Sequence, residues 1–394
     1  MGRALTFFLF LTVVISLAGG LHYFIWARLV RDLELPPALH RTLTTLVVLL
    51  FLSVPLSFWL SQQFPLERMR PLMLLAFGWM GLLFLTVVLL GLGELVRAAW
   101  SLRHALASEL GPPDPERRLA LARILGASVA VLAGGLGAVA THQGLTRLFV
   151  KEVRVPLARL SRGLSGFTIA QLTDVHVGPT IHKAFIEEVV ARTNALEPDL
   201  IAITGDLVDG SVEQLREHVA PLAKLRAKHG VYFVTGNHEY YSGAEDWCAE
   251  LERLGIRVLR NERVAIGGED GFDLAGIDDY NADRFGRGHG ADLPRALDGR
   301  DVERELVLLA HQPRAAFEAQ KLGVGLQLSG HTHGGQIWPW NLFVRLQQPV
   351  VSGLSRFGET LVYVSNGTGY WGPPMRLGAP AEITRVVLES SKPA

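Results

Sequence analysis

The sequence predicts two unlike parts: an N-terminal all-α domain that crosses a membrane four times, followed by an α/β domain. Two observations predict this division. Four uncharged, strongly apolar stretches lie within residues 1–150, and short apolar runs alternate with helical patterns from residue 167 onward. Alternating strands and helices are typical of a layered α/β domain. The overall composition, 49% hydrophobic, is too apolar for an ordinary soluble enzyme.

Each of the four apolar stretches is long enough to cross a hydrocarbon core of about 30 Å as a helix. For the first one, a cleaved signal peptide is the alternative, because Arg3 precedes it and the small residues Ala18, Gly19 and Gly20 lie within it. Its length and the three further stretches favour a span. We therefore predict a transmembrane domain over residues 1–146. The predicted spans are Ala4–Ala27, Thr42–Leu66, Pro71–Gly93 and Ile124–Thr146.

The net charge of zero conceals a difference between the two parts. The first 150 residues carry 12 Lys and Arg against 7 Asp and Glu, whereas the remainder carries 26 against 31. Neither balance has the dense basic face that nucleic-acid binding requires, so we expect no nucleic-acid partner. Cys248 is the single cysteine, which excludes an intramolecular disulfide and leaves the redox compartment open.

Residues 147–166 are rich in Arg and Lys and contain Pro156, which predicts a basic juxtamembrane linker. Residues 167–390 are predicted to form the α/β domain. Its expected helices are Ile181–Leu196, Val212–Lys228 and Ala244–Leu254, and a β-rich stretch covers Ile256–Ile277. Two late strands are expected at Leu361–Ser365 and Ile383–Leu388.

Five short polar clusters occur in order along the α/β domain, and most of them directly follow an apolar run. This layout places them at the carboxyl ends of sheet strands, where open α/β sheets bind ligands. Imidazoles, carboxylates and an amide are suitable donors for two divalent ions, which clamp phosphoryl oxygens and acidify a water molecule. The clusters are Asp174-Val175-His176, Gly205-Asp206, Gly236-Asn237-His238-Glu239, His311 and Gly330-His331-Thr332-His333.

These clusters resemble the calcineurin-like metallophosphoesterase superfamily, whose pattern is D-x-H, G-D, G-N-H-[DE], H and G-H-x-H. All five elements are present in order, and the resemblance covers about Phe167–Leu388. It implies an α/β sandwich of two mixed sheets with flanking helices. The flanking residues resemble the membrane-associated branch, which includes multi-span transmembrane metallophosphoesterases. They include Gln171-Leu172-Thr173, Gly276-Ile277-Asp278-Asp279 and Gly334-Gly335-Gln336.

The resemblance also implies a role for each matching position. Asp174, His176 and His333 would bind one metal ion, and Asp206 would bridge it to a second. His238 would not be a ligand but would donate a proton to the leaving group or stabilise the phosphoryl charge, with a nearby acid orienting it. The ligands implied for the second ion are Asn237, His311 and His331.

Residues outside the motifs are candidate substrate contacts, and each has a structural alternative. Tyr240 and Tyr241 would contact substrate or pack over the metal loops. The aromatic stretch that contains Trp338 and Trp340 would form an apolar wall that contacts a lipid substrate or dips into the membrane surface, or it would anchor its own loop. Arg376 would pair with a substrate phosphate or be a surface charge. Asp209, Asp278 and Asp279 are expected to shape the site without binding metal.

The sequence therefore predicts a membrane-bound dinuclear-metal hydrolase of a phosphate ester or pyrophosphate bond, using metal-activated water. Some relatives in the superfamily act on a lipid-linked nucleotide sugar, so a lipid-linked substrate is one expectation. Mn, Fe, Zn and Mg all accept mixed nitrogen and oxygen ligands, which leaves the metal open. The alternative is a membrane receptor or scaffold that binds a phosphorylated ligand without turnover. The expected partners are the phosphoester and membrane lipids, and the oligomeric state stays open.

The branch implies a multi-pass protein of a bacterial inner or cell membrane. With four spans, the N-terminus and the catalytic domain share one side. Arg28 and Arg31 after the first span outnumber Arg3 before it, and the Arg97–Arg123 loop adds more basic residues to the same side as Arg28. Basic loops stay in the cytoplasm, so the sequence favours a catalytic domain outside it.

Overall fold

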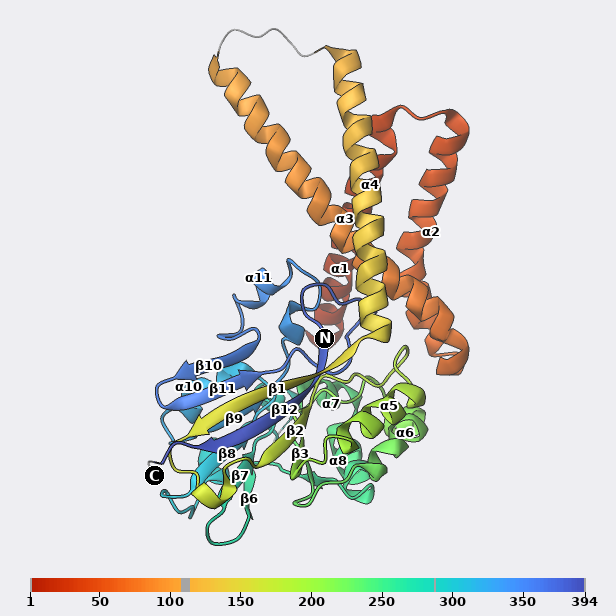
Figure 1. Ribbon diagram of the computed structural model, residues 1–394. Coiled ribbons are helices and arrows are strands. Elements are labelled where there is room, and N and C mark those ends of the chain that lie inside the picture. The colour runs from red at the N-terminus through yellow and green to blue at the C-terminus, as the bar shows by residue number, and fades with distance from the viewer. Residues whose placement is uncertain (1, 108–113, 287, 393–394) are drawn as a thin grey trace. The chain divides into compact units, whose positions relative to one another are not determined.

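The computed structural model describes residues 2–107, 114–286 and 288–392. The chain divides into two compact units, Met1–Thr141 and His142–Ala394. The first unit is built of helices and the second of two sheets with helices around them (Figure 1). This confirms the predicted fold class.

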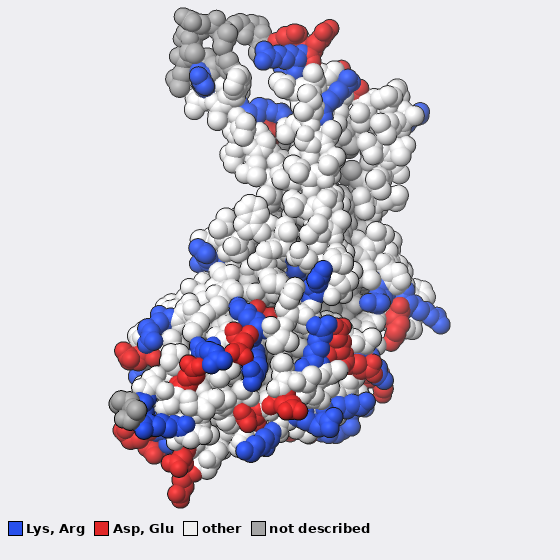
Figure 2. Space-filling model, in the orientation of Figure 1, with Lys and Arg blue, Asp and Glu red and all other residues white. Residues whose placement is uncertain are grey.

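The helical unit contains long apolar helices, and in the described part of the chain four are long and apolar enough to cross a membrane. Figure 2 shows broad uncharged surfaces along them, with Lys, Arg, Asp and Glu gathered at the helix ends. This is the charge pattern that a hydrocarbon environment requires, because ionised side chains are costly there. The helices are α1 (Gly2–Leu29), α2 (Pro37–Ser61), α3 (Leu66–Ala107) and α4 (Pro115–Thr146), with the 3-10 turn η1 (Arg31–Leu33) after α1.

Apolar packing and two indole hydrogen bonds hold the helices of this unit together. Ile25, Leu90 and Val129 form a small buried cluster from α1, α3 and α4. The indole of Trp79 donates to the ring of His22, and the indole of Trp26 donates to the hydroxyl of Thr44. Such pairs satisfy polar groups that would otherwise face lipid without a partner.

The second unit contains two mixed sheets, each of six strands among the described residues. In the first sheet β12 runs antiparallel to β2 and the other neighbours are parallel; in the second, the outer pairs are antiparallel. The first sheet has the order β1 (Leu148–Leu157), β12 (Ala381–Ser390), β2 (Thr168–Leu172), β3 (Leu200–Ile203), β4 (Val231–Phe233), β5 (Arg257–Val258). The second has the order β10 (Gly353–Phe357), β11 (Thr360–Val364), β9 (Leu326–Ser329), β8 (Glu305–Leu309), β7 (Phe272–Gly276), β6 (Glu262–Ile266).

The main core lies between the two sheets. Alternate residues of a strand point to opposite faces, and β8 shows both: Val307 and Leu309 join the core shared with the first sheet, whereas Leu306 and Leu308 pack beneath flanking helices. Strands that are covered on both faces have nearly continuous apolar sequences, and the strands of this unit do. The flanking helices are α5 (Lys183–Asn194), α6 (Val212–Val219), α7 (Asn237–Ser242), α8 (Ala244–Arg253), α9 (Leu293–Ala296), α10 (Ala316–Ala319) and α11 (Asn341–Val344). Short 3-10 turns lie at Arg162–Leu164, Ala220–Lys224, Ala282–Phe285, Pro313–Ala315 and, as η6, at His333–Gly335.

The structure differs from the expectation of a linker over residues 147–166. Ten of these residues form β1, which pairs in parallel with β12 along its whole length. The basic residues that suggested a linker face acidic partners instead: Lys151 pairs with Glu382 at 3.6 Å and Arg154 with Glu389 at 2.9 Å. The end of β1 enters the core through Leu157. This segment is therefore an edge strand whose outer face is charged.

Candidate metal centre

The polar clusters predicted from the sequence lie in the loops after five strands. Asp174 and His176 follow β2, Asp206 follows β3, and Asn237 begins α7 after β4. From the second sheet, His311 follows β8, and the pair His331 and His333 follows β9. Gln171 links the two sheets here, because its buried amide donates to the Thr204 hydroxyl at 2.9 Å and to the Ser329 carbonyl at 3.0 Å.

Glycines in the motifs let the ligand loops approach one another. A Cβ at Gly330 would overlap the carboxylate of Asp174, and one at Gly236 would overlap the carboxylate of Asp206. The backbone N–H of His331 donates to Asp174 at 2.9 Å, and that of His238 donates to Asp206 at 2.9 Å. The glycines therefore permit contacts between backbone and carboxylate that any side chain would block.

Backbone strain is concentrated at the same residues. Nine non-glycine residues in the described ranges have positive φ, and five of them are predicted ligands. Residues held in this region cost on the order of 1–3 kcal/mol each and cluster at functional sites. The five are Asp174, His176, Asp206, His331 and His333, with φ between 50° and 70°.

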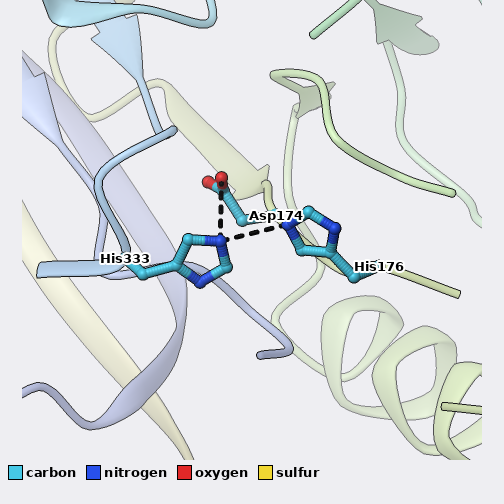
Figure 3. Close-up of side chains that lie close together, drawn as sticks. All are labelled: Asp174, His176 and His333. Carbon is cyan, nitrogen blue, oxygen red and sulfur yellow. Dashed lines mark hydrogen bonds and ion pairs between the residues drawn. The ribbon is translucent and has the colours of Figure 1, made fainter. Parts of the chain in front are cut away.

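One group of ligands consists of Asp174, His176 and His333 (Figure 3). The Nε2 atoms of the two rings face each other at 3.0 Å, and Nε2 of His333 lies 3.5 Å from Asp174. Burial, together with the nearby His176 ring and the Arg376 guanidinium, holds the pKa of His333 well below its usual value. Burial also disfavours the charged form of Asp174, which raises the pKa of that carboxyl. Neutral imidazole is the form that binds a metal.

A second group consists of Asp206, His311 and His331. Nε2 of His311 lies 3.1 Å from Asp206 and 3.2 Å from Nδ1 of His331. Burial and the neighbouring His311 lower the pKa of His331 to about 3. Burial opposes ionisation of Asp206, but His311 and His238 outweigh it and hold the pKa of that carboxyl well below its usual value.

The side chain of Asn237 supplies the test of whether these residues suit a metal. Its Oδ1 atom is buried and has no hydrogen-bond partner among the residues that the structure describes. Leaving such an atom unpaired costs about 1–3 kcal/mol. An unpaired amide oxygen on α7, together with the ring nitrogens and carboxylates of the two groups, supplies the donor types that divalent cations bind. The residues therefore fit a metal centre.

Hydrogen-bond acceptors beside the rings of His176 and His311 determine that Nδ1 of each ring carries a proton. Nδ1 of His311 lies 2.8 Å from the Thr204 carbonyl, and Nδ1 of His176 lies 3.1 Å from the Asp209 carboxylate. Both partners accept, so both Nδ1 atoms donate, and in the neutral ring Nε2 is then the nitrogen that would bind a metal. Ligand histidines in metalloproteins are commonly oriented in this way.

His238 lies beside the two groups and is oriented by Asp209. The Nδ1 atom of His238 lies 2.6 Å from the Asp209 carboxylate, and its Nε2 atom lies 4.0 Å from Asp206. Burial disfavours the charged ring, but Asp206 and Asp209 outweigh it and raise the pKa of His238 to about 9. The pKa of Asp209 falls to about 2, because His176 and His238 outweigh its burial. Asp209, expected only to shape the loop, is thus the acid that orients His238.

The side chain of Glu239 connects the loop of Asp206 to the loop of Asn237. Its fully buried carboxylate accepts from the backbone N–H groups of Gly236 at 2.6 Å, Asp206 at 3.0 Å and Leu207 at 2.8 Å. Burial and the nearby Asp206 raise the pKa of Glu239 to about 7. The acidic residue that ends the Gly236–Glu239 motif therefore holds the loop of the candidate bridging carboxylate in place.

The aromatic residues around the site divide into packed and exposed ones. Tyr240 is buried, and its hydroxyl lies 3.1 Å from that of Thr235, so the packing alternative describes it. The rings of Tyr241 and Trp371 stand edge-on to His238 at 5.4 and 5.5 Å and are 66% and 55% exposed. Trp338 is 55% exposed and lies on the same segment as η6. Tyr241 and Trp371, rather than Tyr240, are the rings that contact His238.

Arg376 is buried, so it is not the surface charge that one of the two expectations described. The residue has no exposed surface, and its guanidinium donates to backbone carbonyls of His333, Asn366, Gly369 and Ala379. Burial lowers the pKa of Arg376 to about 10. These contacts leave it no path to a substrate. Instead it fixes the backbone of the loop that carries His333, a role that the sequence did not reveal.

Comparison with known proteins agrees with this geometry. Residues 167–335 match the family model described as calcineurin-like phosphoesterase. A zebrafish protein named transmembrane protein with metallophosphoesterase domain is 37% identical over 414 residues, covering 99% of this chain and 91% of its own. The chain belongs to the calcineurin-like metallophosphoesterase family.

Other relatives span the membrane part as well. A cattle protein of the same name is 38% identical over 389 residues, covering 93% of this chain and 86% of its own. An uncharacterized metallophosphoesterase of Campylobacter jejuni is 30% identical over 391 residues, covering 98% of this chain and all of its own. This metallophosphoesterase is therefore a membrane protein and a hydrolase of phosphate esters.

We expect Gly330→Ala to lose metal and activity, because the new Cβ would displace the Asp174 carboxylate. Gly163→Ala is the matched control, since the nearest atom to its Cβ is Ser161 Oγ at 3.9 Å. Metal content by elemental analysis, measured alongside thermal unfolding, separates the two variants. If Gly330→Ala bound metal as the parent does, the close approach of these loops would not matter to the centre.

Proposed function

We propose that this metallophosphoesterase is a dinuclear enzyme that hydrolyses a phosphate ester or pyrophosphate bond with water as the direct nucleophile. The observation that carries the proposal is the position of Asp206. Its Oδ2 atom lies 3.1 Å from the His311 ring of one ligand group and 3.9 Å from the His176 ring of the other. A carboxylate between two ligand groups is suited to bridge two ions.

The proposed ligands form two sets. Asp174, His176 and His333 would hold one ion, and Asp206 would be shared with the other. When bound, the ions would neutralise the phosphoryl oxygens and supply a nucleophile near neutral pH. The second set would be Asn237, His311 and His331, which gives the orphaned Asn237 Oδ1 a partner.

His238 is the proposed general acid. Its Nδ1–H is held by Asp209, so the proton on Nε2 is the one available to a leaving oxygen. The ring is partly exposed, with 16% of its side chain accessible, whereas the ligand His311 has none. His238 is therefore placed to meet a substrate and His311 is not.

Asp206→Asn and His238→Ala should impair the enzyme in different ways. Asp206→Asn removes the proposed bridging charge, so metal content and turnover of bis(p-nitrophenyl) phosphate should both fall. His238→Ala should keep its metal and lose about 10²–10⁴-fold in rate, as loss of a general acid does, with larger losses for leaving groups of higher pKa. Metal loss in His238→Ala would make this histidine a ligand, and two ions retained at normal activity in Asp206→Asn would overturn the dinuclear assignment.

We propose further that the leaving group is apolar, as in a lipid-linked substrate. A leaving oxygen that receives a proton from His238 brings its substituent against the exposed rings of Tyr241 and Trp371. Aromatic rings that border a reactive group favour apolar groups, because contact removes both surfaces from water. Trp338 is a candidate to extend this apolar contact.

Trp371→Ala should lower kcat/KM about tenfold or more for a lipid-linked phosphodiester in mixed micelles, since burying an aromatic side chain contributes about 1.5–3 kcal/mol. The loss for a small polar ester such as glycerol 3-phosphate should be much smaller. Phe317→Ala, which removes a comparably exposed ring paired with Phe357 on the second sheet, is the control. Equal losses on both substrates would assign Trp371 a packing role.

We propose that the catalytic domain lies outside the cytoplasm. Arg28, at the end of α1, and Arg31, just after it, support this orientation, because basic residues beside the first span weigh most. Arg28 also pairs with Asp32 and Glu94, at 2.8 and 3.0 Å. Orientation follows the basic residues rather than the net charge, so these pairs do not oppose it.

A carboxy-terminal fusion to alkaline phosphatase, which is active only outside the cytoplasm, should be active in a bacterial host. A fusion at the same position to a fluorescent protein that folds only in the cytoplasm should be dark. The opposite pair of results would place the hydrolase in the cytoplasm.

A further inference from the structure

The segment after η6 exposes a group of large apolar side chains. Five such residues within nine positions are each between 51% and 82% exposed, and α11, which lies among them, has no buried residue. The rings of Trp340 and Phe343 stack against each other at 5.2 Å, so these side chains form one surface. We call this surface the α11 patch; it consists of Trp338, Trp340, Leu342, Phe343 and Leu346.

The exposure decides between the two roles that the sequence left open for these aromatics. A loop anchored on its own domain would bury its rings, and Tyr370, in the neighbouring loop, is buried as that role requires. The α11 patch does not follow this pattern. Contiguous exposed apolar surface is uncommon on soluble proteins and marks a site that contacts a partner or a membrane.

The charges around the α11 patch favour a lipid surface as the partner. Residues 319–358 contain no Asp or Glu, whereas Lys321, Arg345 and Arg356 are basic. Arg345 is exposed within the patch itself. In Figure 2 the surface over α11 is white and blue. Aromatic and aliphatic side chains with a basic residue among them are the composition of segments that lie in an anionic membrane interface.

The chain also tethers the second unit to the predicted membrane part. The apolar stretch of α4, residues 124–146, is about 34 Å long as a helix, enough to cross a hydrocarbon core of about 30 Å. α4 ends at Thr146 and β1 begins at Leu148. Two residues reach at most about 7 Å, so the sandwich starts where the span ends. A lipid surface is therefore always within reach of the second unit.

We propose that the α11 patch inserts into the interfacial region of the membrane that the chain spans, with Arg345 at the level of anionic headgroups. The inference rests on exposure, charge and connectivity, and is independent of which phosphoester is cleaved.

Insertion would act on the active site through Gln336. Its side-chain amide donates to the carbonyls of Trp371 and Pro373 at 2.9 and 3.0 Å, and its Oε1 atom accepts from the backbone of Trp371. The backbone N–H of Trp338 donates to the Leu377 carbonyl. The segment that would enter the lipid is thus bonded to the loop whose Trp371 ring contacts His238. Docking would fix this wall of the site at the membrane surface.

The test uses an environment-sensitive fluorophore on the full chain. Cys248 is the single cysteine in the sequence and is buried, so Leu346→Cys in a Cys248→Ser background gives one label site on the patch. Val302→Cys in the same background is the matched control, an apolar residue of the same unit that is 62% exposed. Both are labelled with a nitrobenzoxadiazole dye and placed in nanodiscs of phosphatidylcholine and phosphatidylglycerol, with and without nitroxide-labelled lipid.

The label at residue 346 should emit at shorter wavelength than the label at 302 and lose several-fold more fluorescence to nitroxide lipid. A water-like spectrum without lipid quenching at both positions would overturn the proposal. A short-wavelength spectrum without lipid quenching would also overturn it, because protein, such as a second copy of the chain, would then cover the patch.

Two further arms separate folding and charge effects from docking. If Cys248→Ser lowers the yield of folded protein, the labels are introduced with Cys248 retained, since burial raises the pKa of its thiol to about 12 and keeps it unreactive. Arg345→Glu in the Leu346→Cys chain should reduce the quenching in anionic discs. Unchanged quenching in that variant would overturn the part of the proposal that assigns Arg345 to the headgroups.

Discussion

The central constraint on this structure is the crowding of buried ring nitrogens and carboxylates at the ends of the strands. Ring nitrogens of His176 and His333 face each other at 3.0 Å, and those of His311 and His331 at 3.2 Å. In the metal-binding form each of these nitrogens presents a lone pair, and such nitrogens repel at this distance unless a cation lies between them. A cation bound at each group would make the close approach of these nitrogens favourable, because their lone pairs would face a positive charge. The sheets, the positive-φ loops and the motif glycines all serve to hold this arrangement.

The residues that position the ligands contribute as much to the arrangement as the ligands do. Glu239 ties the Asp206 loop to the loop of Asn237 through three backbone donors. Asp209 holds both His176 and His238, so one carboxylate couples a ligand to the proposed general acid. A change in the position of Asp209 would therefore affect metal binding and proton transfer together. Such coupling makes the effects of single substitutions non-additive.

The sequence predicted the parts of the structure that follow from periodicity. Four apolar stretches predicted four spans, and apolar runs followed by polar clusters predicted strands that end in the site. The ligand sets came from a motif pattern; the structure brings their histidines and aspartates together and leaves their roles, and the ligand role of Asn237, as predictions. Residue spacing could not show which of Tyr240 and Tyr241 faces His238, because adjacent residues of α7 differ only by the rotation of the helix.

Two errors came from reading charge without partners. Residues 147–166 resembled a basic linker because the acidic residues that pair with them, Glu382 and Glu389, lie more than 200 positions later. Arg376 resembled a surface charge because its partners are backbone carbonyls, most of them within ten residues and one from His333, and a backbone acceptor leaves no signature in the sequence. A local sequence pattern predicts the burial of apolar residues. Burial of an arginine depends on whether the fold supplies hydrogen-bond acceptors for its guanidinium.

The contrast between Arg376 and the α11 patch shows how this loop region departs from the usual distribution of side chains. A charged residue is buried, and tryptophans nearby are exposed. Five backbone carbonyls accept hydrogen bonds from the buried Arg376 guanidinium and connect it to the residues around His333. The tryptophans keep about half of their surface exposed although they contact neighbouring rings. In a chain whose sandwich begins two residues after a membrane span, a bilayer is the surface that would cover them.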